Sequence, residues 1–126
     1  MKIVLAAAIV ATAAAAAFAQ AAAPAKVADT PKGKALTTEK GFTLYTFDKD
    51  AGGKSACNGP CATNWPPLAA PASAKASGDW TIIARDDGSK QWAYKGKPLY
   101  AWTKDAKPGD TTGDGFLNNA WHIARP

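Results

Sequence analysis

The chain has 126 residues, a formal net charge of +5 and an isoelectric point of about 9.3. A chain of this length holds one domain with a modest core and is too short for two. Its basic residues are mostly lysines spread along the sequence, whereas nucleic-acid-binding domains gather Lys and Arg on one element. The charge pattern therefore argues against a nucleic-acid partner.

The N-terminus has the pattern of a secretory signal peptide. Lys2 precedes an alanine-rich apolar run that reaches Phe18, and residues 17–19 fit an A-x-A cleavage site. We predict a signal peptide over 1–19, cleavage near Ala19, and a periplasmic or secreted protein; a retained signal is the alternative. No cysteine stands near the cleavage site to carry a lipid, and no later run is apolar and long enough to span a membrane. We therefore expect no N-terminal lipid anchor and no transmembrane segment in the mature chain.

The next residues, 20–34, are rich in Ala, Pro and Lys without hydrophobic periodicity and predict a flexible leader, so that the domain itself covers 35–126. Residues 42–47 are β-branched and aromatic and predict a strand. A cysteine-bearing loop follows over 54–64. The two prolines in 65–68 then favour an extended segment.

The clearest pattern lies in the second half of the chain. Residues 80–85, 90–94 and 97–102 predict three strands, joined by tight turns at Gly88 and Gly96, which make an antiparallel meander. A glycine-rich loop over 108–115 leads to a last strand over 120–124. No segment predicts a helix. The fold class expected is all-β, a small, loop-rich antiparallel sheet domain.

A seven-residue pattern occurs twice, at 44–50 and 99–105, each copy preceded by a glycine and followed by a turn and a long loop. An Asn-Trp segment comes after each loop. We predict two repeats, about 41–68 and 96–123, packed about a pseudo-twofold axis, because one repeat alone has no partner for its apolar face.

Each copy of the pattern carries a tyrosine, a second aromatic residue and an aspartate, namely Tyr45, Phe47 and Asp50 in the first and Tyr100, Trp102 and Asp105 in the second. Alternation along a strand places the two aromatic rings of a copy on one face. These rings form either a core ladder or an exposed platform for a flat or sugar-like ligand. The aspartates at the strand ends predict acceptors for backbone N–H groups, with metal binding as the alternative.

Cys57 and Cys61 are the only cysteines, and in an exported protein they predict a local disulfide. The alternative is a redox or soft-metal site, in which Cys57 and Cys61 act with His122, the only histidine. His122 is a rim residue or a ligand, and Trp65, Trp121 and His122 are the candidate binding residues. No metal is assigned; Cys57, Cys61 and His122 are only weak candidate ligands.

These motifs resemble a family of bacterial secreted repeats, predicted lipoproteins that carry a Tyr-x-(Phe/Trp/Tyr)-x-x-Asp motif. The resemblance extends from about Gly41 to Ile123 and includes the Cys57–Cys61 loop and the Asn64-Trp65-Pro66-Pro67-Leu68 segment. It implies an exported protein, often lipid-anchored, and no defined activity. This chain lacks the lipidated cysteine of that pattern.

No nucleophile–base pair, phosphate loop or carboxylate cluster is evident, so we expect no enzyme. The function predicted is a non-catalytic binding or structural module of the cell envelope, with an unknown envelope component or a small ligand as its partner and no cofactor. The alternative is a periplasmic redox or copper-handling protein that uses Cys57, Cys61 and His122.

Overall fold

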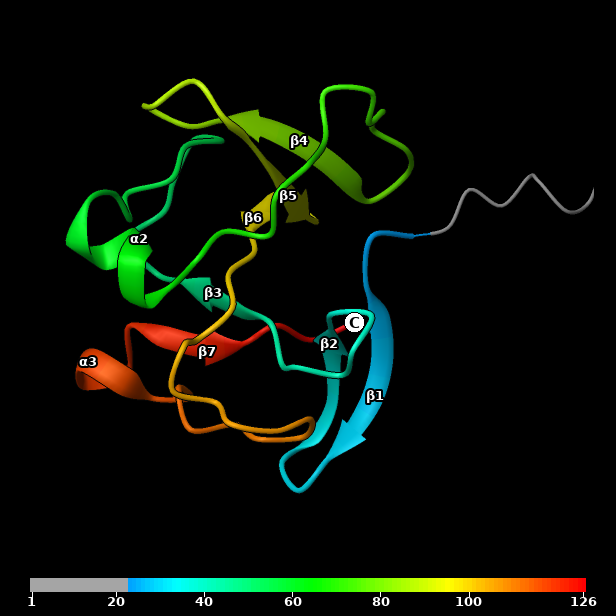
Figure 1. The fold of residues 1–126 in the computed structure, drawn as a ribbon, viewed down its shortest axis with the longest axis vertical. Coiled ribbons are helices and arrows are strands. Elements are labelled where there is room, and N and C mark those ends of the chain that lie inside the picture. Colours follow the sequence, from blue (N-terminus) through cyan, green and yellow to red (C-terminus); the bar gives the residue numbers. More distant parts are fainter. Residues whose placement is uncertain (1–22) are drawn as a thin grey trace, which may run out of the picture.

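The computed structural model describes residues 23–126, so the predicted signal peptide and its cleavage site lie outside the described residues. Short strands in separate antiparallel sheets dominate the fold (Figure 1). In chain order the elements are β1 Lys26–Thr30, β2 Gly33–Thr37, β3 Tyr45–Phe47, α2 Pro60–Asn64, β4 Trp80–Ala84, β5 Lys90–Tyr94, β6 Lys97–Pro98, α3 Phe116–Asn119 and β7 Trp121–Ile123. The predicted all-β class is confirmed.

The described strands form three sheets, β1-β2, β3-β7 and β4-β5-β6. The third sheet is the predicted meander, with Ile82 opposite Trp92 and Ala93 opposite Pro98. Its last strand is shorter than expected. Leu99 still donates to the Trp92 carbonyl of β5 at 3.1 Å, and the next residue, Tyr100, pairs with Tyr45 of β3.

The prediction of a flexible leader over 20–34 is wrong where the structure describes it, because β1 and β2 form a hairpin there. Val27 lies opposite Leu36, and the turn is fixed by Thr30, whose hydroxyl donates to the Gly33 carbonyl at 2.8 Å. Gly33 has φ +101°, which a glycine adopts without strain. Leu36 is buried, so the hairpin is part of the domain.

Two short helical turns correct the expectation that no helix is present. The turns, α2 and α3, stand just before Trp65 and Trp121 and so occupy matching places in the two repeats. The two turns differ in backbone conformation. Leu117 and Asn118 of α3 have positive φ, 59° and 54°, whereas no residue of α2 has positive φ.

Backbone hydrogen bonds show that the two repeats exchange segments. Ala124, at the end of the second repeat, accepts from Leu36 and donates to Leu44, both of the first repeat, at 2.9 and 2.8 Å. Leu68, at the end of the first repeat, accepts from Trp92 and donates to Leu99 of the second, both at 2.9 Å. Each Trp segment therefore lies between the hairpin and the motif strand of the other repeat, as the predicted pseudo-twofold arrangement requires.

Both faces of the motif strands are buried. One face belongs to an aromatic cluster of Ala35, Tyr45, Phe47, Cys57, Trp65, Tyr100, Trp102, Trp121 and Ile123. The other belongs to a smaller aliphatic cluster of Leu36, Leu44, Leu99 and Ala124. The motif is thus the centre of the core.

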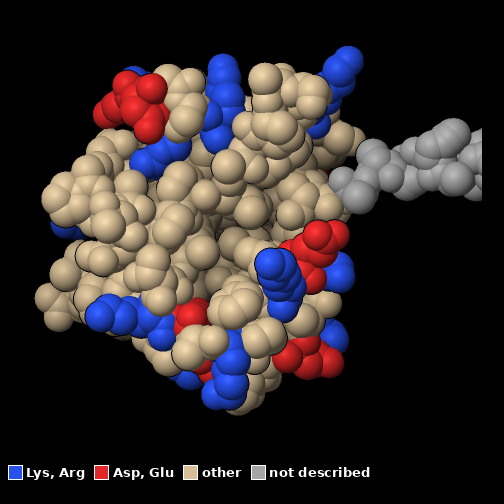
Figure 2. All heavy atoms as spheres, in the orientation of Figure 1, with Lys and Arg blue, Asp and Glu red and all other residues tan. Residues whose placement is uncertain are grey.

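Figure 2 shows that basic and acidic side chains are scattered over the face in view, and that they do not gather in one patch.

Candidate functional site

Four aromatic rings form one continuous stack through the middle of the domain. Trp65 and Trp121 lie face to face with ring centroids 3.7 Å apart. Trp102 stacks on the outer face of Trp65 at 3.9 Å, and Phe47 stacks on Trp121 at 4.1 Å. Each tryptophan is therefore covered by an aromatic residue of the opposite repeat, which is a symmetric arrangement.

The motif tyrosines close the sides of this stack. Tyr45 meets Trp65 edge-on at 5.3 Å and Tyr100 meets Trp121 in the same way at 5.1 Å. All six rings are at most 8% exposed. The exposed-platform interpretation is therefore wrong, and the structure places Trp65 and Trp121, expected as candidate binding residues, in the core.

The tyrosine of each motif donates a hydrogen bond to the aspartate of the other motif. The Tyr45 hydroxyl lies 2.7 Å from Asp105 Oδ2, and the Tyr100 hydroxyl lies 2.6 Å from Asp50 Oδ2. The two tyrosines also pair through their backbones, N to O, at 2.8 and 3.0 Å. The spacing Tyr-x-aromatic-x-x-Asp is thus explained by contacts across the pseudo-twofold axis, which sequence reasoning missed. The duplication of the motif was the signal that could have suggested them.

The aspartates also accept backbone N–H groups, as was expected of them. Asp50 accepts from Ala56 at 2.7 Å, and Asp105 accepts from the amide and hydroxyl of Thr112 at 3.0 and 2.6 Å. Each carboxylate therefore ties its own downstream loop to the opposite tyrosine.

Burial shifts the pKa values of the groups in this network. Burial, and next the hydrogen bond to the facing aspartate, raise the pKa of the Tyr45 and Tyr100 hydroxyls well above the usual range. Burial also raises the pKa of the Asp50 carboxyl. Both phenols therefore remain protonated hydrogen-bond donors at physiological pH, which is the form the structure needs.

The Cys57–Cys61 disulfide is present, with an S–S distance of 2.07 Å and Cα atoms 5.2 Å apart. Arg85, which sequence reasoning did not single out, forms hydrogen bonds with this loop. Its Nη2 donates to the Cys57 carbonyl at 2.6 Å, and its Nη1 donates to Gln91 Oε1 at 2.7 Å and Ser55 Oγ at 3.1 Å. Arg85 is 6% exposed, so its charge is compensated by several oxygen acceptors in the core.

His122 lies on β7 and is paired with Asp48 of the first repeat, Nε2 to Oδ2 at 2.8 Å. The His122 side chain is 44% exposed and the Asp48 side chain is 60% exposed, so the pair lies at the surface of the domain. Cys57 and Cys61 have given their sulfurs to the disulfide, and residues 23–126 contain no group of three or more His, Cys, Asp and Glu side chains that could hold a metal. The structure therefore does not bring His122 and the cysteines together as a ligand set.

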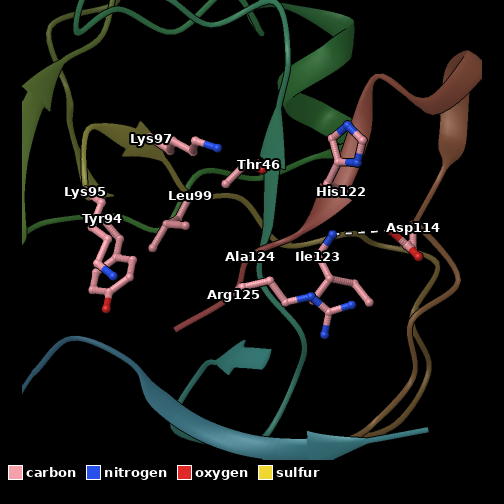
Figure 3. Close-up of a pocket in the computed structure, with 10 residues that line it drawn as sticks. All are labelled: Thr46, Tyr94, Lys95, Lys97, Leu99, Asp114, His122, Ile123, Ala124 and Arg125. Carbon is pink, nitrogen blue, oxygen red and sulfur yellow. Dashed lines mark hydrogen bonds between the residues drawn. The ribbon is translucent and has the colours of Figure 1, made fainter. Parts of the chain in front are cut away.

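His122 instead lines a cavity of about 390 Å³ between β7 and the β5–β6 turn (Figure 3). Three cationic side chains also line it, Lys95, Lys97 and Arg125. Figure 3 shows Lys95, Lys97 and Tyr94 at one side and Arg125 and His122 at the other. The remaining lining is Thr46, Leu99, Asp114, Ile123 and Ala124.

The cations of this cavity outnumber its acids. Asp114, the only acid in the lining, accepts from the Ile123 amide at 3.3 Å and pairs with Lys32 at 3.4 Å. Lys95 stands over the Tyr94 ring at 5.2 Å, and no carboxylate of residues 23–126 pairs with Lys95 or Lys97. We call this the cationic cavity. Its chemistry suits an anion that has an apolar part.

Within residues 23–126, none of the helices has both the length and the apolar character that crossing a membrane demands. Comparison with curated proteins and comparison with solved structures give no match. A family model described as a secreted repeat of unknown function matches residues 26–69 and 81–125. The two matches start at β1 and just inside β4, so the family's repeat unit includes the hairpin as well as the motif strand. The chain therefore belongs to this family of secreted repeats and carries two copies of the repeat.

Proposed function

We propose that the protein is an exported, non-catalytic binding module, and that its ligand is a small anion held in the cationic cavity. The observation that carries the proposal is the convergence of Lys95, Lys97, Arg125 and His122 on one hollow. The core motifs serve as the scaffold, because their aromatic rings are buried.

The size and lining of the cavity support binding of a small molecule. Ligand sites are typically hollows of roughly 300–1,000 Å³ that combine apolar walls with a few convergent polar groups. Here Leu99, Ile123 and Ala124 supply the apolar wall. An anion that enters gains attraction from several cations at once, and the partial exclusion of water strengthens each attraction.

The same lining favours binding over catalysis. His122 is oriented by Asp48, as a general base would be. The lining offers His122 no serine or cysteine, and its threonine, Thr46, makes no hydrogen bond with the His122 ring among residues 23–126. The lack of a nucleophile paired with a base in this lining supports binding over catalysis.

Titration calorimetry at low ionic strength tests this proposal, with inorganic phosphate and succinate as probes. We expect at least one probe to bind, with an affinity that falls as salt rises. Lys97→Gln should weaken binding about tenfold, which corresponds to about 1.4 kcal/mol. Lys75→Gln, in the exposed loop before β4, is the matched control and should bind as the wild type does. Absence of binding by both probes, or equal binding by the two variants, would refute the proposal.

The redox or copper-handling alternative requires thiolates, and it predicts free thiols and copper uptake by the native protein. Thiol titration under non-reducing conditions, together with elemental analysis, tests it. If thiol titration finds no free thiol and elemental analysis finds no copper, Cys57 and Cys61 form neither a reduced dithiol nor a copper site in the native protein.

A further inference from the structure

A second hollow adjoins the cationic cavity. It measures about 230 Å³ and shares two lining residues with the cationic cavity, Thr46 and Lys97. The rest of its lining is Phe47, Asp48, Asp50, Gly96 and Pro98. We call this second hollow the acidic cavity. The two hollows adjoin at Thr46 of β3 and Lys97 of β6, and we call the pair the groove.

The two ends of this groove have opposite charge. Lys95, Lys97 and Arg125 line the cationic cavity against one acid, Asp114, whereas Asp48 and Asp50 line the acidic cavity against one cation, the shared Lys97. Asp48 is the more available of the two acids. It is 60% exposed and uses one oxygen for His122, while both oxygens of Asp50 already accept hydrogen bonds, from Ala56 and Tyr100. The groove is therefore dipolar, and Asp48 marks its acidic end.

We propose that the ligand of this groove is a zwitterion of the short-peptide class; this rests on the proposed function and names its ligand. The C-terminal carboxylate lies near Lys95 and Arg125, which line only the cationic cavity, and the N-terminal ammonium lies at Asp48. Thr46 and Lys97, which belong to both cavities, face the middle of the peptide. Polar side chains at that place suit the polar backbone of a peptide better than an apolar chain.

The dipolar lining also discriminates against the simplest competitors. A dianion long enough to span the groove would place its second charge next to Asp48, where like charges repel, whereas a short anion stays at the cationic end. A dication would meet the lysines at the other end. Only a ligand with opposite charges at its two ends gains attraction at both.

Calorimetry with three probes tests the proposal: trialanine, its N-acetyl form and its C-terminal amide. We expect trialanine to bind most tightly, and each blocked form to bind several-fold more weakly, because each block removes one of the two charges. Asp48→Asn should abolish the preference for free trialanine over the N-acetyl form. Asp29→Asn, an exposed aspartate on β1, is the matched control and should keep that preference.

The outcomes separate this inference from the proposed function. Equal binding of trialanine and N-acetyl-trialanine, with both weakened by Lys97→Gln, would overturn the zwitterion while anion binding stands. Binding of succinate or phosphate alone, with no binding of any peptide, would do the same. Absence of binding by every probe would overturn both proposals. Because Asp48 is exposed, its replacement leaves the core intact, and unchanged circular dichroism of Asp48→Asn verifies this.

Discussion

Tyr45→Phe is the sharpest test of the bond between the two repeats. The substitution keeps the ring, which packs against Trp65, and deletes only the hydroxyl that donates to Asp105 at 2.7 Å. The same hydroxyl accepts from the Gly113 amide at 3.3 Å, so a second buried group loses its partner. The change isolates the polar contact from the aromatic packing.

The expected loss of stability follows from the surroundings of the bond. A hydrogen bond to a charged acceptor contributes about 1.5–3 kcal/mol. Asp105 is 7% exposed, so water does not easily replace the hydroxyl, yet its other oxygen keeps both bonds from Thr112. We therefore expect Tyr45→Phe to lower the free energy of unfolding by about 2 kcal/mol, and Tm by roughly 8–16 °C for a domain of this size.

Urea unfolding followed by tryptophan fluorescence measures this effect, because the stacked tryptophans report on the core. Tyr94→Phe is the control. Its ring is half-buried, and its hydroxyl makes no hydrogen bond to any side chain or backbone group among residues 23–126. A Tyr45→Phe midpoint equal to that of Tyr94→Phe would show that the contact between tyrosine and aspartate is not a source of stability.

Three further changes test other parts of the structure. Gly113→Ala should cost about 1–3 kcal/mol, because the added Cβ would lie 2.6 Å from Trp65 Cη2 and 3.0 Å from Trp102 Cδ1; an unchanged urea midpoint and near-ultraviolet circular dichroism would contradict this. Replacing Cys57 and Cys61 together by alanine should cost about 2 kcal/mol, the loop-closure value for so short a ring, and should make the midpoint insensitive to reductant. The Ala106 amide donates to Asp110 and lowers the pKa of its carboxyl, so the charge of Asp110 stabilises the fold above the unfolded pKa, and this contribution is lost as pH falls through the lowered folded pKa. Asp110→Asn should therefore be less stable than the wild type at pH 7, with a difference that shrinks in urea titrations as pH falls below about 4 and vanishes only below the lowered folded pKa.

The features that the sequence predicted correctly depend on local chemistry. The meander follows from alternating aromatic and β-branched residues between the turns at Gly88 and Gly96, whose positive φ angles of 89° and 85° suit glycine. The disulfide follows from two cysteines in an exported chain. The duplicated motif pointed to a pseudo-twofold arrangement, because one repeat alone has no partner for its apolar face.

The β1–β2 hairpin was missed because its strands are short and mainly polar. Its buried residues Ala35 and Leu36 stand side by side in the chain and point to opposite clusters, so no alternating pattern marks the strand. Leu36 is buried in the aliphatic cluster with Leu44, Leu99 and Ala124, and Ala35 is buried in the aromatic cluster, so both depend on residues outside the hairpin. Tertiary packing, not local propensity, makes this hairpin.

The candidate site was only partly predictable. His122 was singled out as the only histidine, and the structure places it at the rim of the cationic cavity. Lys95, Lys97 and Arg125 could not be found as a group, because they stand on a turn, a strand and the chain end and meet only after folding. Lysines spread along a sequence can still converge on one hollow in space.

The crossed tyrosine–aspartate bonds have a consequence for how small this fold can be. A chain with a single copy of the repeat would carry a tyrosine without its aspartate, an aspartate without its tyrosine, and a tryptophan with no aromatic residue on its outer face. Two such chains could satisfy these groups only by binding each other about a true twofold axis, each contributing what the other lacks. The two-repeat chain is in effect such a dimer joined into one polypeptide, and neither half is expected to fold by itself.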